Sequence, residues 1–598
     1  MGLNSIHQPA SLYISPSRQT IPMGGTILID ANIEVQADEA PQDYVLLPFV
    51  NERRWGAHER PDGDGRVTFQ LPFPNPGPAQ VQVIAVKSDT DEWMGLSQQR
   101  ELLLAGHPLP STADLVSNVI SLHVTRRSFP TTEPAVKGTL FGLQWEPWFT
   151  GGVQRWSTAQ AVPVMGFYNS YNRDVTRQHV LWCMELGVDF LFTDWTNHIW
   201  GCQHWNERPE HVNTLLHSTQ LTLEVLAEMR DEGLPVPKMV LFPGLSNGRP
   251  CTMQALNEEL EWIYQQYLRN PRFNGLWLDF DGKPLVVVLD TGAIGDRRGT
   301  AVSAFRIPFI KQTLELSADD LDAFRNAQPP VDDSHFTVRW MSSQNDTTHH
   351  HDLGYWSWMD GTDQPPVTYR NGIAEAVTVT PSFFGALGWT ASTARGRHGG
   401  ATYLDTFKVA MQHRPQVVFL HQFNEYSGQK DGHGMGPQHD IYVDTYSVEL
   451  SDDIEPVSPT APGYRGDSGG WGFYYLNLTR ALMDLYRGKV DDSTVLAVSS
   501  PLRSEVLKEA TCHVTRTTIG AAVKHFTIAI DGIPVQQELT ANFADVDMSA
   551  LEPGPHTLTV IADDATTCYP LSWDFLDTPL EVPVQVYVDV PIIRAVER

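Results

Sequence analysis

The feature of this 598-residue chain that most constrains its fold is a double change in the spacing of its apolar residues. From about residue 10 to 130, and again after about 495, apolar and polar residues alternate, as at Ile27, Ile29 and Ala31, between frequent Gly and Pro. Between about 139 and 490, continuous apolar runs alternate with segments of helical spacing. The first pattern is typical of antiparallel sheets and the second of parallel βα units.

These patterns predict an α/β fold in which a central (β/α)8 barrel, or TIM barrel, spans residues 139–490. We expect an antiparallel β-sandwich over residues 1–135 and another over residues 495–598. A doubly wound open sheet is the alternative, but the chain has no Gly-rich nucleotide loop to support it. The expected barrel strands are 164–170, 189–195, 238–244, 285–290, 336–342, 355–360, 376–381 and 416–423.

The charge and hydropathy of the chain exclude two kinds of partner. The sequence has 42 Lys and Arg against 71 Asp and Glu, and a net charge of -29 repels a phosphate backbone. Nucleic acid is therefore not an expected partner. No apolar run reaches the roughly 20 residues that cross a bilayer, and residues 1–15 lack the basic and apolar regions of a signal peptide. We expect a soluble protein, with its export left open.

The cysteines and histidines do not predict a metal or a cofactor. The five cysteines form no Cys-x-x-Cys pair, although Cys512 and Cys568 could pair within the C-terminal sandwich. His349, His350 and His351 are consecutive, and consecutive residues do not point three imidazoles at one ion. A solvated loop is the expected structure there.

The aromatic content favours a carbohydrate ligand. The chain has 17 Trp, 18 Tyr and 25 Phe, and many of them stand next to polar residues. Sugar-binding clefts stack aromatic faces on pyranose C–H surfaces while carboxylates and amides bind the hydroxyls. Large apolar cores are the alternative explanation for the same composition.

The reaction face of such a barrel is built by the loops that follow its strands, so polar residues at strand ends are the candidate site. The most specific run is 419–426, where an apolar strand ends in Asn424, Glu425 and Tyr426. We expect Glu425 to be catalytic, with Asp194 as the second carboxylate, because glycoside hydrolysis generally needs a pair. Asp290 and Asp360 are rivals of Asp194. The expected substrate-binding residues are Tyr168, Asn169, Trp195, Asp290, Arg339, Trp358, Asp360, His421, Asn424 and Tyr426.

About 300 residues of the barrel segment resemble glycoside hydrolase families 71 and 99, the fungal α-1,3-glucanases and the endo-α-mannosidases. The resemblance lies in the runs 166–170 with 186–189, 192–195, 280–286 and 423–426. In the mannosidase branch the last motif resembles Asn-Glu-Trp-x-Glu, with both glutamates at the reaction centre. Here the second position is Gly428, so the resemblance implies that the partner of Glu425 comes from another strand, which favours Asp194.

The sequence thus predicts hydrolysis of an α-linked or unusual glycosidic bond by a carboxylate pair, with a carbohydrate substrate and no cofactor. A carbohydrate-binding protein that has lost catalysis is an alternative, and the absence of an acid at Gly428 supports it. A transglycosylase acting on the same glycan is the third possibility. The carboxyl separation distinguishes retention, at about 5 Å, from inversion, at about 6.5 to 9.5 Å.

Overall fold

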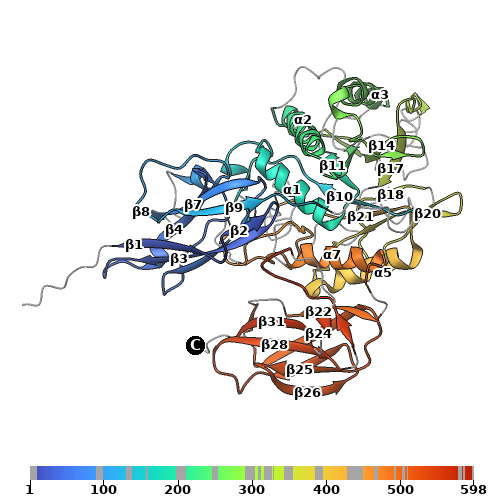
Figure 1. Cartoon of the computed structure of the whole chain (residues 1–598). Helices are drawn as coiled ribbons and strands as arrows, with labels where there is room; N and C mark the ends of the chain where they lie inside the picture. Colours follow the sequence, from blue (N-terminus) through green and yellow to red (C-terminus); the bar gives the residue numbers. More distant parts are fainter. Residues whose placement is uncertain are drawn as a thin grey trace, which may run out of the picture.

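The computed structural model describes residues 10–594 apart from several segments, the longest being 89–98, 130–137, 197–209, 245–252, 290–303, 316–322, 343–353, 384–394 and 427–448. Three regions follow one another along the chain: an N-terminal module (11–125), a central region (140–486) and a C-terminal module (494–594). The N-terminal module lies beside the central region, and the C-terminal module lies beneath helices α5 (Ala401–His413) and α7 (Tyr474–Tyr486) (Figure 1).

The described strands of the N-terminal module form two sheets, with the orders β1-β3-β6 and β2-β9-β7-β4-β5, and β8 pairs with β7. In β3, Ile27, Ile29 and Ala31 are buried while Asp30 and Asn32 face solvent, because successive side chains of a strand point to opposite faces. The strands are β1 (Ser11–Pro16), β2 (Thr20–Pro22), β3 (Thr26–Glu34), β4 (Tyr44–Val50), β5 (Arg53–Arg54), β6 (Arg66–Pro72), β7 (Gly77–Lys87), β8 (Leu115–Val116) and β9 (Ile120–Thr125).

The central region contains one nearly closed barrel sheet. Within the described residues, parallel pairing runs through β18-β17-β14-β12-β11-β10-β21-β20. No ladder is described between β18 and β20, where the Thr378 hydroxyl donates to the Ser357 carbonyl. These strands are β10 (Leu140–Trp145), β11 (Phe190–Trp195), β12 (Lys238–Pro243), β14 (Lys283–Leu289), β17 (Thr337–Ser342), β18 (Trp356–Ser357), β20 (Ile373–Val379) and β21 (Val417–Leu420).

Shorter elements complete this region. β13 (Asp279–Phe280) pairs with β14, β19 (Thr368–Arg370) pairs with β20, and β15 (Ala304–Ile307) pairs with β16 (Gln312–Glu315). Single helical turns lie at Pro41–Asp43 and Arg100–Leu103 in the N-terminal module and at Val153–Trp156, Tyr264–Leu268, Pro271–Phe273 and His398–Gly400 in the central region.

Apolar side chains fill the barrel interior. The Phe192 ring stacks on Phe242 with 4.4 Å between centroids and lies 4.8 Å from Phe419. Helices α1 (Arg173–Leu186), α2 (Glu210–Asp231) and α3 (Met253–Ile263) connect the first strands of the ring. Asn172 caps α1 by accepting the backbone N–H of Asp174, and Gly187 ends the helix at φ 74°.

The predicted first barrel strand, 164–170, is wrong, and β10 takes its place. The run is apolar because it is buried against the N-terminal module rather than in the barrel. Val164 and Met165 accept backbone hydrogen bonds from Ala57 and Gly56, and Phe167 accepts one from Ala105. Residues 140–145 carry an equally apolar pattern that ends in Gln144 and Trp145.

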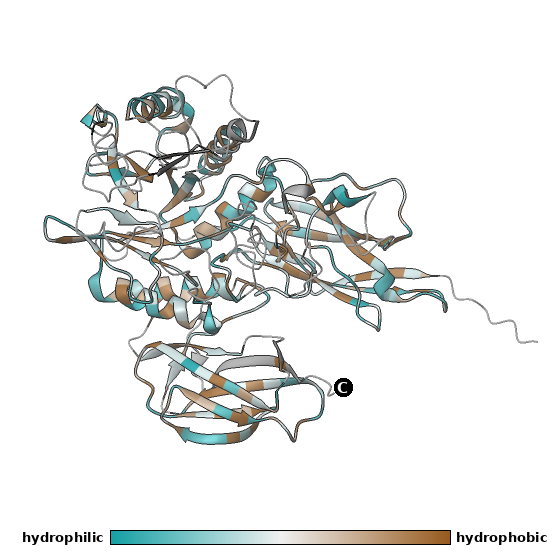
Figure 2. Ribbon diagram, turned by 180° about the vertical axis from the view of Figure 1, so that it is seen from behind, coloured by the Kyte–Doolittle hydropathy of each residue, from teal (hydrophilic) through white to brown (hydrophobic). Residues whose placement is uncertain are grey.

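The described strands of the C-terminal module also form two sheets, with the orders β27-β24-β22-β29-β30 and β23-β31-β28-β25-β26. Figure 2 shows hydrophilic and hydrophobic residues alternating along these strands. They are β22 (Thr494–Ser500), β23 (Glu505–Leu507), β24 (Thr511–Gly520), β25 (Phe526–Ile530), β26 (Ile533–Leu539), β27 (Phe543–Asp547), β28 (Gly554–Ala562), β29 (Thr567–Cys568), β30 (Val582–Pro583) and β31 (Val586–Arg594). The division of the chain into three independent folding units stays a prediction.

The sheet register argues against a Cys512–Cys568 disulfide. Cys568 lies opposite Val495, whereas Ser500 lies opposite Thr515, and Cys512 is further along the same direction. The two cysteines are therefore separated by more than five residues along the strands, roughly 17 Å, beyond the Cα separation that a disulfide allows.

Among the described residues, no helix is both long and apolar enough to span a membrane.

Gly142 in β10 provides a test of the barrel packing. A Cβ atom on Gly142 would overlap the Phe190 ring, which is fully buried in the barrel interior. We expect Gly142→Ala to lower the free energy of unfolding by about 1–3 kcal/mol, measured by urea denaturation. Gly63→Ala, at an exposed position where the added Cβ meets only the Gln42 amide, is the control. Equal stability of both variants would contradict this packing.

Candidate active site

Five acidic side chains gather at the carboxyl ends of the barrel strands, and we call them the acidic cluster: Glu146, Asp194, Glu425, Asp452 and Asp453. Glu146 follows β10, Asp194 ends β11, and Glu425 follows β21. Glu146, Asp194 and Glu425 lie close together because β10 pairs with both β11 and β21. All five are buried, and Glu425 is the most exposed at 8%.

The Gln144 side chain joins this cluster. Its Nε2 donates to Glu146 Oε1 at 3.0 Å and to Asp194 Oδ2 at 3.1 Å. Its Oε1 accepts from Trp358 Nε1 at 2.6 Å and faces His421 Nδ1 at 2.8 Å. Since the amide oxygen is the acceptor, His421 Nδ1 carries a proton, and its Nε2 faces Asp452 Oδ2 at 3.0 Å.

Glu425 is held from two sides. Its carboxylate accepts a short hydrogen bond from Gln422 Nε2, and its backbone N–H donates to Asp453 Oδ1. The loop that carries Asp453 is held by Arg397, whose guanidinium donates to the carbonyls of Ser451 and Asp453. Arg397 is fully buried, and its guanidinium lies 3.9 Å from the Trp471 ring centroid. Glu425 is thus positioned by Gln422 and by the loop that carries Asp453.

A buried chain of hydrogen bonds fixes Asn424 and the backbone of Glu146. Asn424 Oδ1 accepts from the Glu146 N–H at 2.8 Å, and Asn424 Nδ2 donates to the Tyr168 hydroxyl at 3.0 Å. That hydroxyl donates to Glu455 Oε2 at 2.9 Å. Because Trp145 Nε1 donates to His179 Nδ1, the proton of His179 is on Nε2, which donates to Glu455 Oε1 at 2.9 Å. Glu455 thus accepts from both Tyr168 and His179 and links the two halves of this chain of hydrogen bonds.

Burial and mutual repulsion shift the acids of the cluster. Burial raises the pKa of Asp194 to about 6, against hydrogen bonds from Thr196 and Gln144 that favour its carboxylate. Burial raises the pKa of Glu146 well above its ordinary value, and the charges of Asp194 and Glu425 raise it further. Burial and the nearby Asp452 do the same for the pKa of Glu425. The site therefore keeps protons on some carboxyls while Asp194 ionises near neutral pH.

The structure brings several predicted residues to the cluster. Asp194, Glu425, His421 and Asn424 are buried in it, and Trp358 is half-buried at its edge. Tyr168 contacts it only through its hydroxyl. Asp360 is buried two residues beyond Trp358, and Asp290 lies outside the described residues.

Four other predicted residues lie elsewhere. Trp195 is buried outside the barrel, where its Nε1 donates to Thr219 of α2, because it alternates with the inward-facing Asp194. Arg339 contacts Asp281 and Glu375 near the amino end of β20, at the opposite end of the barrel. Tyr426 packs on the Trp156 ring, and Asn169 bonds the Gly151 carbonyl in the β10–α1 loop. These positions do not place them around Glu425.

Sequence reasoning missed Gln144, Glu146, Asp452, Asp453 and Glu455. The first two lie at the end of β10, where an apolar strand leads into Gln144, Trp145 and Glu146 much as the apolar strand β21 leads into Asn424 and Glu425. The other three lie in an irregular loop with no periodic signal. Only the tertiary contacts of that loop distinguish them from ordinary solvated acids.

Among the described residues, no group of three or more His, Cys, Asp or Glu side chains has an arrangement that could hold a metal ion. The His349–His351 run lies outside the described residues.

No protein-family model and no curated protein matches this chain. Among solved structures, it is similar to the GH99 endo-α-mannosidase from Bacteroides thetaiotaomicron, with 16% identity, coverage of 58% of this chain and 99% of that one, and a TM-score of 0.37. It is also similar to Bacteroides uniformis β-glucuronidase 2, with 9% identity, coverage of 98% and 61%, and a TM-score of 0.28. These neighbours are glycoside hydrolases, but likeness at this level establishes neither a family nor a function.

The raised pKa of Glu146 predicts that Glu146→Gln gains stability relative to wild type as pH rises. The pKa of Glu146 is raised on folding, so the folded state keeps a proton that the unfolded state releases above the ordinary value of 4.5. The contribution of Glu146 to wild-type stability is thus greatest below that value and falls as pH rises toward the folded pKa. Glu146→Gln removes this loss, so its free energy of unfolding relative to wild type should rise by up to about 1.4 kcal/mol per pH unit.

Urea denaturation of both proteins at pH 5, 6 and 7 measures this difference. Glu258→Gln, at an exposed position in α3, controls for the loss of one negative charge. A difference between Glu146→Gln and wild type that does not change over this range would show that Glu146 is not protonated by folding.

Proposed function

We propose that this chain is a glycoside hydrolase that cleaves an α-linked glycan with carboxyl groups of the acidic cluster. The observation that carries the proposal is the pairing of a carboxyl that ionises near pH 6, Asp194, with more strongly protonated neighbours, Glu425 and Glu146, at the strand ends of a parallel barrel sheet. Acetal hydrolysis needs one carboxyl as a proton donor and another as a carboxylate.

In this proposal Glu425 is the general acid. It transfers its proton to the leaving glycosidic oxygen as the C–O bond breaks, and its raised pKa keeps that proton in place at neutral pH. Asp194 is the carboxylate that stabilises or attacks the anomeric carbon, or removes a proton from water. Water supplies the hydroxyl and proton that complete both products. Gln144 holds Asp194 and Glu146 in one geometry.

The finer assignments belong to the same proposal. We infer a complete (β/α)8 barrel between two β-sandwiches and a relationship to families 71 and 99, supported by the strand order and by the motifs at 192–195 and 423–426. The half-buried Trp358, held by Gln144, is the aromatic wall of a sugar subsite. His421 and Asn424 position groups of the site, and no cofactor takes part.

Replacement of Glu425 tests the proposal directly. Glu425→Gln keeps the size of the side chain but removes the acid, so we expect kcat on α-mannan or α-1,3-glucan to fall by roughly a thousandfold or more. The release of reducing ends measures the rate, and circular dichroism checks the fold. Glu258→Gln should retain wild-type activity. Full activity of Glu425→Gln would remove Glu425 from the mechanism.

The same assay separates the alternative functions. Binding of these glycans by wild type without release of reducing ends would favour a carbohydrate-binding protein. Products that lack new reducing ends would favour transglycosylation.

The pH profile tests the role of Gln144. Its amide favours the carboxylate of Asp194, so Gln144→Leu should raise the Asp194 pKa from about 6. If ionised Asp194 is required, the acidic limb of kcat/KM moves upward by about one pH unit. Trp358→Phe removes a donor to Gln144 but no donor to a carboxyl, and its acidic limb should stay in place. Coincident profiles for Gln144→Leu and wild type would contradict this role.

A further inference from the structure

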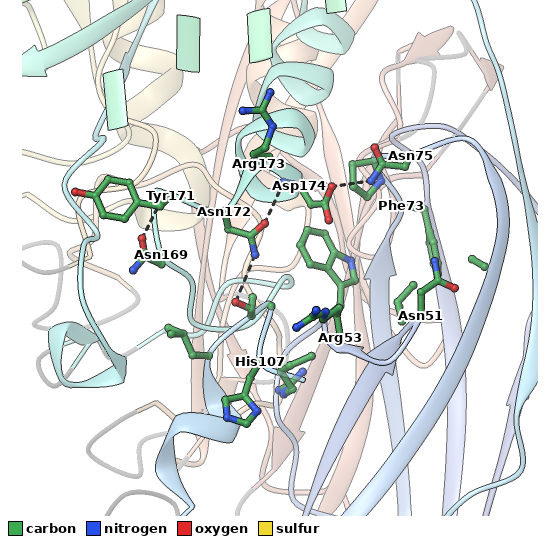
Figure 3. A pocket seen from close by; sticks show the side chains of 18 of the residues that line it. Asn51, Arg53, Phe73, Asn75, His107, Asn169, Tyr171, Asn172, Arg173 and Asp174 are labelled. Carbon is green, nitrogen blue, oxygen red and sulfur yellow. Dashed lines mark hydrogen bonds between the residues drawn. The ribbon is translucent and has the colours of Figure 1, made fainter. Parts of the chain in front are cut away.

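A cavity lies outside the acidic cluster, between the N-terminal module and the start of α1. Its volume is about 720 Å³, within the range of small-molecule sites. Three segments of the N-terminal module line it, at 50–55, 73–79 and 104–107, and one segment of the central region, at 169–174. Figure 3 shows labelled residues from both regions around the same space.

The wall of this cavity is apolar and rigid. Trp55 and Phe73 are buried at 6% and 3% exposure, and Pro74, Pro76 and Pro78 continue the same surface. The Trp55 indole is fixed because its Nε1 donates to the Pro72 carbonyl at 2.6 Å. Flat apolar surfaces of this kind match the C–H faces of pyranose rings.

Polar groups with unused hydrogen-bonding capacity surround this apolar surface. Within the described residues, the exposed Arg53 guanidinium has no hydrogen-bond or ion-pair partner. Asn51 uses its Oδ1 to accept from Gln80 N–H, and Asn75 uses its Nδ2 to donate to Asp174. The Nδ2 of Asn51 and the Oδ1 of Asn75 remain for a ligand.

The charge of the cavity argues for hydroxyl-rich ligands. Arg173 is already paired with Glu224 and Glu228, and Asp174 is held by Asn75. Arg54 also lines the cavity, but it is fully buried and donates to the carbonyls of Pro48, Gly56 and Leu102. The exposed Arg53 guanidinium alone is too little positive charge for a polyphosphate, and one engaged carboxylate is too little for a cation. Amides and a single Arg beside an aromatic surface suit a sugar chain.

The chain itself connects this cavity to the acidic cluster. The β10–α1 loop begins at Glu146 and ends at Asn172, and within it Tyr168 bonds Asn424 of the candidate site while the adjacent Asn169 lines the cavity. Gly106 permits the close approach of the two regions, because a Cβ there would lie 2.9 Å from Asn172 Nδ2. The cavity is therefore built on the same loop that positions Glu146.

We propose that this cavity is a second, non-catalytic glycan-binding site that holds an oligosaccharide segment of the substrate away from the cleavage point. The choice of a glycan rests on the proposed function, whereas the existence of a binding site rests on the cavity itself. Arg53 and Asn51 bind hydroxyl or carboxylate oxygens, and Pro76 and Pro78, backed by the buried Trp55 and Phe73, contact a ring face.

Calorimetric titration of the full chain carrying Glu425→Gln tests this site. The probes are six-unit oligosaccharides of α-mannan and α-1,3-glucan, with an oligogalacturonate of equal length as the acidic probe. We expect two binding events for at least one probe, and the addition of Arg53→Ala or of Asn75→Ala should weaken one of them by about tenfold. Arg66→Ala, an exposed arginine on β6, is the matched control and should change neither.

Hydrogen exchange locates the event, with protection expected at 50–55 and 104–107 on addition of the same probe. Two events unaffected by both variants, or no protection of these segments, would overturn the proposal, as would the absence of binding by all three probes. Hydrolysis is read separately, in chains that retain Glu425. If the cavity variants lose the second binding event but cleave a short α-glycoside at the wild-type rate, the result supports a non-catalytic binding site in the cavity. A second event in a chain that cleaves no glycan keeps the binding site and rejects the proposed function.

Discussion

The contact on which the candidate site depends is the amide of Gln144, which donates to Glu146 and Asp194 while its oxygen accepts from Trp358 and faces His421. Carboxyl groups brought together in a dry interior repel one another and lose their hydration, so they need donors or protons. Gln144 supplies the donors without supplying a positive charge. Some of the acids consequently retain protons, which is the condition that acid–base chemistry on a sugar requires.

Buried carboxyl groups are compensated differently at the two ends of the barrel. Near the amino end of β20, Glu375 is paired with Arg339 and Arg370 and accepts from Trp356 Nε1. At the other end Arg397 donates to the carbonyls of Ser451 and Asp453, and within the described part of the chain the carboxyl of Glu425 accepts from the Gln422 amide. Neutralised acids stabilise the first end, whereas unneutralised acids at the second end are a cost that a functional site explains.

The flanking modules contribute to the central region through specific contacts. The His58 ring and Glu59 are fully buried against the loop that follows the acidic cluster, where Glu59 accepts from Ser458 at 2.5 Å. The C-terminal module begins near α7, and Tyr569 donates to Asp484 of that helix at 2.9 Å. The loop 451–458 is thus held from the N-terminal module as well as from Arg397, which fixes Asp452 and Asp453 beside Glu425.

The sequence by itself determined the succession of strand-rich, βα and strand-rich regions, most of the barrel strands, and the presence of Asp194 and Glu425 at strand ends. These features are local, because apolar spacing reports which residues of one segment are buried. Only the tertiary structure decided that residues 164–170 pack against the N-terminal module, that Trp195 faces outward, and that Arg339 lies at the far end of the barrel. It also decided that Gln144, Glu146 and the loop at 452–453 join Glu425. These relations depend on which strands are neighbours and where a loop returns, and residues far apart in the chain carry no local signal of either.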